Sequence, residues 1–111
     1  MNHAVPEIGS RAAHDLHESG DVILLDVREP DEWQSGHAPG ALHIPLGELD
    51  PDRLSGSEIV VVCRFGNRSA HATQRLTEAG LVARNLVGGM KAWANDGLPV
   101  VTPQDGPGTV A

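Results

Sequence analysis

The residues with the clearest chemical potential form one short segment from Cys63 to Ser69, with the sequence CRFGNRS. The apolar run 59–62 just before it is typical of a buried strand, and the apolar spacing after it predicts a helix that begins at Ser69. In open α/β sheets ligands bind at the carboxyl ends of strands, where helix N-termini also offer unpaired N–H groups. The segment therefore predicts an anion-binding loop that carries a thiol nucleophile.

A cysteine reacts as its thiolate, and the setting of Cys63 favours that form. Arg64 and Arg68 flank it in a window, 59–77, that has no acidic residue. A charge within about 4 to 6 Å shifts a pKa by about 1 to 3 units, and an exposed helix end contributes less than about 1 kcal/mol. We therefore expect the arginines, provided that they face Cys63, to lower its pKa more than the helix end does. The competing interpretation is a small hydrophobic residue that ends a core strand.

Composition excludes several classes of protein. The chain has 111 residues, which suits one domain, and its single cysteine cannot form an internal disulfide. With 15 acidic against 8 basic residues and a net charge of -7, we expect no nucleic-acid partner. No apolar run approaches the roughly 20 residues that cross a bilayer, and the N-terminus lacks a signal-peptide pattern, so we expect no membrane association and a cytoplasmic location.

Short apolar runs alternate with amphipathic stretches along the chain, which predicts an α/β fold with a mainly parallel sheet flanked by helices. The expected strands are 22–27, 41–44, 59–62 and 85–87, and the expected helices are 11–18, 69–79 and 90–95. We expect one domain over 7–101, an N-terminal extension over 1–6 and a flexible tail over 102–111, where proline and glycine interrupt any period.

Four motifs in order resemble the single-domain sulfurtransferases of the rhodanese family over about 7–99. They are LDVRE at 25–29 with Glu32 and Trp33, GHAPGA at 36–41 leading to Ile44 and Pro45, the Cys63 loop, and GGM at 88–90 with Trp93 and GLP at 97–99. The resemblance implies the three-layer rhodanese-like fold.

The resemblance also implies an activity. Cys63 would take sulfane sulfur from a small anionic donor, thiosulfate or a persulfide, and pass it to cyanide or a thiol, and a sulfur-relay protein is a further candidate partner. The loop that binds substrate and persulfide would comprise Arg64, Phe65, Gly66, Asn67, Arg68 and Ser69. We expect neither a metal nor an organic cofactor.

Histidine and acidic residues near the first motif suggest a Cys-His-acid triad, because histidine is a common activating base. The resemblance implies instead that these residues support the loops beside the site. They are Asp26, Arg28, Glu32 and His37.

Two other functions compete with sulfur transfer. The phosphatase branch of the same fold, which includes arsenate reductases, has one more residue between its cysteine and arginine than the six-residue segment from Cys63 to Arg68, which disfavours that chemistry. A non-catalytic persulfide carrier or protein-interaction module is the other alternative, and the presence of Cys63 argues against docking alone.

Overall fold

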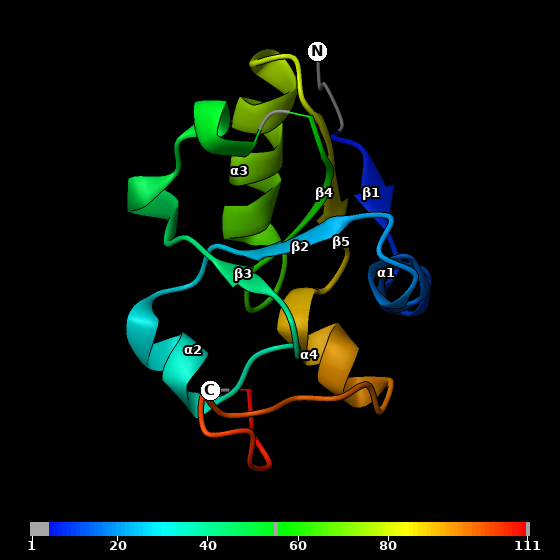
Figure 1. Ribbon diagram of the computed structural model, residues 1–111, viewed down its shortest axis with the longest axis vertical. Helices are drawn as coiled ribbons and strands as arrows, with labels where there is room; N and C mark the ends of the chain where they lie inside the picture. The colour runs from blue at the N-terminus through cyan, green and yellow to red at the C-terminus, as the bar shows by residue number, and fades with distance from the viewer. Residues whose placement is uncertain (1–4, 55, 111) are drawn as a thin grey trace.

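The computed structural model describes residues 5–54 and 56–110, and these contain a five-stranded sheet in the order β1-β5-β4-β2-β3 (Figure 1). Every neighbouring pair is parallel. The strands are β1 (Glu7–Ile8), β2 (Ile23–Asp26), β3 (Leu42–His43), β4 (Glu58–Val62) and β5 (Val82–Leu86). Because all strands point the same way, their carboxyl ends meet at one edge.

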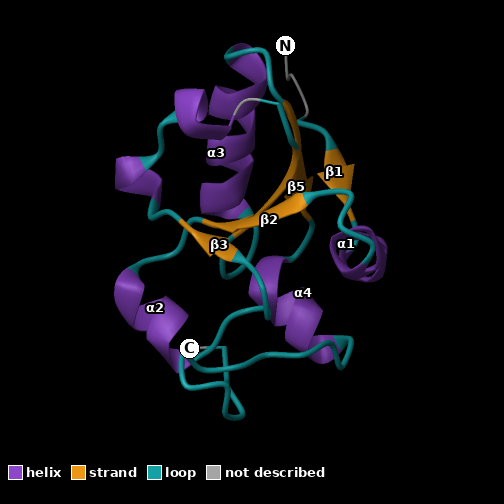
Figure 2. Ribbon diagram, in the orientation of Figure 1, coloured by secondary structure: helices purple, strands orange, loops and turns teal. Residues whose placement is uncertain are grey.

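Helices cover both faces of the sheet (Figure 2). Helices α1 (Ser10–Glu18) and α4 (Gly89–Asn95) pack on one face, and α3 (Asn67–Glu78) packs on the other. The remaining helical segments are α2 (Pro30–Ser35) and the 3-10 turns η1 (Leu46–Glu48) and η2 (Pro51–Leu54). The predicted α/β fold is thereby confirmed.

The central strand β4 supplies side chains to both layers. Val60 and Val62 join the cluster under α1 and α4, whereas Ile59 and Val61 join the cluster under α3. All four are at most 1% exposed. Because both faces of β4 are buried, its sequence from Ile59 to Val62 is an uninterrupted apolar run.

Several boundaries differ from the sequence prediction. Helix α3 begins at Asn67 rather than Ser69, and β5 begins at Val82 rather than Asn85, because Arg84 interrupts the apolar pattern of the strand. The unpredicted α2 is a polar helix that starts with Pro30 and is held by a reciprocal capping box between Glu29 and Glu32. The unpredicted β1 has only two residues, too few for a periodic pattern.

The segment expected to be a flexible tail folds back on the domain. Val101, the last residue of the predicted domain, exchanges backbone hydrogen bonds of 2.9 Å with His37, and within the tail the Thr109 N–H donates to the Ser35 carbonyl at 2.9 Å. Val110 packs against the cluster under α1 and α4. These contacts use mostly backbone groups, which leave no side-chain pattern in the sequence.

The expected terminal segments also include residues 1–4 and 111, which lie outside the described residues. The domain boundaries at 7 and 101 stay a prediction. No helix within 5–54 or 56–110 is long and apolar enough to cross a membrane.

The return of the tail requires glycine at position 36. A Cβ atom there would lie 2.5 Å from the Thr109 carbonyl oxygen and 2.7 Å from the Thr109 nitrogen. We expect Gly36→Ala to lower the free energy of unfolding by about 1 to 3 kcal/mol, as overpacking does. Gly47→Ala is the matched control, because a Cβ atom at Gly47 meets nothing within 4 Å. Equal urea midpoints for the two variants would show that the tail does not pack against Gly36 in solution.

Candidate active site

Cys63 follows the last residue of β4, at the edge where the carboxyl ends of the strands meet. Its side chain is 1% exposed. The Sγ atom accepts a hydrogen bond from the Gly66 N–H at 3.1 Å and lies 3.2 Å from the Ser69 Oγ. The sulfur is thus enclosed by the loop that follows it in the chain.

Helix α3 starts inside the predicted loop, and this directs N–H groups at the sulfur. Gly66 precedes its first residue with φ of 111°, a left-handed conformation that favours glycine. Burial raises the pKa of the Cys63 thiol, but the Ser69 hydroxyl and the N–H groups of Ser69, Gly66 and Phe65 together lower it more, so the pKa falls below its ordinary value. The groups in contact with the sulfur are a hydroxyl and amides rather than Arg64 or Arg68, and the predicted effect of the arginines on the pKa of Cys63 stays a prediction.

The start of α4 holds the other side of the loop. The Met90 N–H donates to the Cys63 carbonyl at 2.8 Å, and the Lys91 N–H donates to the Arg64 carbonyl at 3.0 Å. A Cβ atom on Gly89 would overlap both carbonyl oxygens, so only glycine permits this approach. The carbonyls therefore point to α4, away from the sulfur.

Arg68 faces α2 and forms a two-pronged ion pair with Glu32. Its Nη1 and Nη2 donate to Oε1 and Oε2 at 2.7 and 2.9 Å. These hydrogen bonds hold the pKa of Glu32 at about 2 against the raising effect of burial, with help from the Glu29 N–H and the Arg28 charge. The same pair raises the pKa of Arg68. The guanidinium is therefore committed to a carboxylate rather than to the thiol.

Arg64 and Phe65 form the outer rim of the loop. The guanidinium carbon of Arg64 lies 4.8 Å from the centroid of the Phe65 ring, which is a cation–π contact. Phe65 is 56% exposed, and Asn67 is also exposed. The side chains of Phe65 and Asn67 are thus available to an incoming molecule, whereas Arg64 is half-buried.

Asp26 and Arg28 form a fully buried ion pair at the end of β2. The Arg28 Nη2 donates to the Asp26 Oδ2 at 2.8 Å and to the Gly36 carbonyl at 2.7 Å. Both side chains are 0% exposed. Since Asp26 is in register with Val62, the pair lies beside the strand end that carries Cys63.

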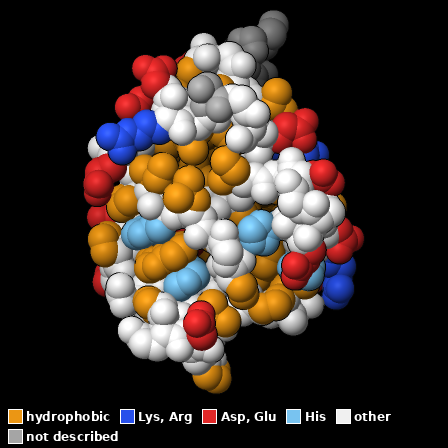
Figure 3. All heavy atoms as spheres, in the orientation of Figure 1, with side chains coloured by type: hydrophobic (Ala, Val, Ile, Leu, Met, Phe, Trp, Pro, Cys, Tyr) orange, Lys and Arg blue, Asp and Glu red, His pale blue; other side chains and the backbone are white. Residues whose placement is uncertain are grey.

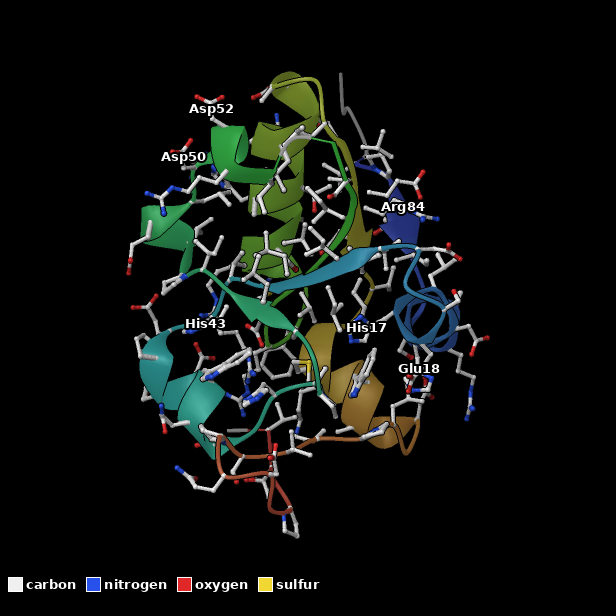
Figure 4. All side chains as sticks on the ribbon, in the orientation of Figure 1. His17, Glu18, His43, Asp50, Asp52 and Arg84 are labelled. Carbon is white, nitrogen blue, oxygen red and sulfur yellow. The ribbon has the colours of Figure 1, made fainter. Side chains whose placement is uncertain are left out.

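His37 is directed away from the thiol. Its Nδ1 lies 3.0 Å from the Trp33 carbonyl oxygen, which can only accept, so Nδ1 carries hydrogen. The imidazoles of His37 and His43 both stack on the Trp33 ring, and His43 extends from β3 toward α2 (Figure 4). In the described part of the chain no hydrogen bond joins His37 to Cys63. Figure 3 shows histidine side chains among hydrophobic ones on this face.

Sequence reasoning missed two residues that shape the site, Gly89 and Asn85. Asn85 is 4% exposed, accepts from the Ser69 hydroxyl at 2.6 Å and donates to the Gly66 carbonyl at 3.1 Å. A polar amide inside an otherwise apolar strand run was the available signal. Gly89 entered the sequence analysis only as the second glycine of the GGM motif, without a role of its own.

A parallel sheet with a cysteine at a strand-to-helix turn defines an α/β protein with a thiolate-type site. The family model described as the rhodanese-like domain matches residues 10–96. The chain belongs to this family, as its motifs suggested.

Relatives and a solved structure agree with this assignment. A protein named sulfurtransferase from Allochromatium vinosum is 40% identical, with 90% of this chain and 98% of the relative covered. Thiosulfate sulfurtransferase 16 of Arabidopsis thaliana is 39% identical, with 78% of this chain and 85% of the relative covered. An uncharacterized Synechocystis protein is 38% identical over 90% of this chain, which spans only 58% of that longer protein. The crystal structure of a rhodanese-related protein from Thermoplasma volcanium has a TM-score of 0.79 and 31% identity, with 86% and 97% of the two chains covered.

The effect of the Ser69 hydroxyl on the pKa of the Cys63 thiol should be measurable by alkylation. We expect Ser69→Ala to raise the pH midpoint of Cys63 alkylation by iodoacetamide by about one unit, because a hydrogen bond to a charged group is lost. His71→Ala, on the exposed side of α3, is the control and should keep the parent's midpoint. An unchanged midpoint in Ser69→Ala would assign the lowered pKa to the amides alone.

The Arg68–Glu32 pair should make stability depend on pH in acid. The lowered pKa of Glu32 means that its stabilisation is complete above the ordinary value of 4.5 and is lost as the pH falls toward about 2. The difference in free energy of unfolding between the parent and Glu32→Gln should therefore shrink over this window. In the Arg68→Ala background the shrinkage should be much weaker. Equal slopes in both backgrounds would contradict the pairing.

Proposed function

We propose that the protein is a sulfurtransferase in which Cys63 carries sulfane sulfur as a persulfide. The observation that carries the proposal is the enclosure of the Cys63 sulfur by the Gly66 N–H at 3.1 Å and the Ser69 hydroxyl at 3.2 Å, at the start of α3. Such donors favour a negatively charged sulfur. Membership of the rhodanese-like family, and relatives named sulfurtransferases, support sulfur transfer in general.

The proposed reaction has two displacements at sulfur. The Cys63 thiolate attacks the outer sulfur of thiosulfate, a sulfur–sulfur bond forms, and sulfite leaves with the electron pair of the bond that breaks. An acceptor, cyanide or a thiolate, then attacks the outer sulfur of the persulfide and regenerates the Cys63 thiolate. A low-molecular-weight persulfide would serve as donor by the same displacement, with a thiolate as leaving group. Every step uses groups of this chain and its substrates.

The other predicted site residues take supporting roles in this proposal. Arg64, on the rim, would attract the anionic donor, while Phe65 would contact the donor or acceptor. Glu32 would hold Arg68 beside the loop, and the Asp26–Arg28 pair and His37 would maintain the surrounding turns. A cytoplasmic location and a sulfur-relay partner remain predictions.

The experiment below also distinguishes two alternative functions. A persulfide carrier would accept sulfur at Cys63 without turning over small acceptors. Phosphatase or arsenate reductase chemistry would need room for a tetrahedral oxyanion, and the short loop with its sulfur already enclosed by Gly66 and Ser69 argues against it.

The first experiment is intact mass after incubation with thiosulfate, with thiocyanate formation measured in parallel. We expect the parent to gain one sulfur atom that reductant removes and to form thiocyanate from cyanide. Cys63→Ser should lose both signals while keeping the parent's circular dichroism, because it removes the only thiol. Sulfur uptake without thiocyanate would favour the carrier, and turnover of an aryl phosphate at a comparable rate would overturn the proposal.

A further inference from the structure

Asn85 is a buried amide that connects two points of the Cys63 loop from a neighbouring strand. It lies in β5, which pairs with β4, and is 4% exposed. Its Oδ1 lies 2.6 Å from the Ser69 Oγ, and its Nδ2 donates to the Gly66 carbonyl at 3.1 Å. The Gly66 N–H and the Ser69 hydroxyl both contact the Cys63 sulfur, and Asn85 bonds the Ser69 hydroxyl directly and the Gly66 residue through its carbonyl.

The orientation of the Asn85 amide follows from its partners. A backbone carbonyl can only accept, so the group near the Gly66 oxygen must be the amide NH₂. The group that faces Ser69 is then the amide oxygen, which can only accept. The Ser69 hydroxyl must therefore be the donor in its 2.6 Å bond with Asn85.

The Ser69 hydroxyl has only one hydrogen, and two acceptors are within reach of it. When Cys63 is a thiol, its S–H can donate to the Ser69 oxygen while Ser69 donates to Asn85. When Cys63 is a thiolate, the sulfur can only accept, so it competes with the Asn85 oxygen for the Ser69 hydrogen and can draw that hydrogen to itself. The Asn85 oxygen then loses its Ser69 partner in a buried position, which is costly.

We propose that Asn85 is a positioning residue that competes with the Cys63 thiolate for the Ser69 hydrogen and, through the Gly66 carbonyl, anchors the loop residue whose N–H faces the sulfur. The competition makes formation of the Cys63 thiolate depend on the hydrogen bond between Ser69 and Asn85, in which the sulfur itself takes no part. This inference deepens the proposed function because it concerns the same nucleophile. Because the inference concerns only the ionisation of the Cys63 thiol, its test does not depend on which sulfur donor the protein uses.

The charged groups around the loop act separately from this relay. They are Arg64 in the loop, Arg68 on α3, Lys91 on α4, Glu32 on α2, and the Asp26–Arg28 pair at the end of β2. Among the described residues none of them makes a hydrogen bond to the side chain of Asn85 or Ser69. The test leaves all of them unchanged.

The test is a double-mutant cycle read by the pH midpoint of iodoacetamide alkylation, which needs no sulfur donor. Asn85→Leu removes the amide with little change in shape, and it is made in the parent and in the Ser69→Ala background. Loss of the Gly66 contact affects both backgrounds alike, whereas loss of the competition requires Ser69. We expect the shift caused by Asn85→Leu to be more negative by about half a pH unit when Ser69 is present. Identical shifts in the two backgrounds would overturn the proposal.

A second measurement keeps the proposal testable if Asn85→Leu fails to fold. The side-chain amide signals of Asn85 are followed by ¹⁵N NMR as the pH passes through the Cys63 midpoint. We expect them to shift with that midpoint in the parent, because the amide oxygen loses the Ser69 hydrogen, and to stay constant in Ser69→Ala. Constant signals in the parent, or equal shifts in both proteins, would show that Asn85 has only a structural role.

Discussion

The close approach of α4 to the Cys63 loop is the constraint on which the site depends. Two N–H groups at the start of this helix bind the carbonyls of Cys63 and Arg64, and Gly89 permits the contact because it has no Cβ atom. With these carbonyls held on one side, the N–H groups that follow in the chain can face the sulfur on the other. The reactive atom is therefore positioned by two helix starts and one strand end, with backbone groups as the main contacts.

The groups in direct contact with the Cys63 sulfur are neutral dipoles. The Gly66 N–H and the Ser69 hydroxyl lie 3.1 and 3.2 Å from the sulfur, whereas the Arg68 guanidinium is bound by Glu32. Dipoles that are already oriented need no reorganisation when charge appears on the sulfur. In the proposed function Arg64 on the rim would attract the anionic donor, so different groups would serve binding and activation.

The buried Asp26–Arg28 ion pair fixes the segments around the loop, at a cost in desolvation free energy. Asp26 and Arg28 are removed from water, and an ion pair in this position offsets its desolvation only when its geometry is good. Arg28 bonds both Asp26 oxygens and the Gly36 carbonyl, whereas its Nη1 is buried without a hydrogen-bond partner among the described residues. The pair thus connects the end of β2 to the turn at Gly36, on which the C-terminal segment packs.

The sequence by itself determined the α/β class, the central strand, the helix after it and Cys63 as the nucleophile candidate, because each depends on a contiguous run of residues. It did not determine the partner of Arg68, since Glu32 is 36 positions away, or the contact of Asn85 with Ser69, which is 16 positions away. The return of the C-terminal segment to Gly36 was also invisible. These contacts form only when the strand order brings distant segments to one edge of the sheet, and the partners of Arg68 and Ser69 were therefore decided by the tertiary structure.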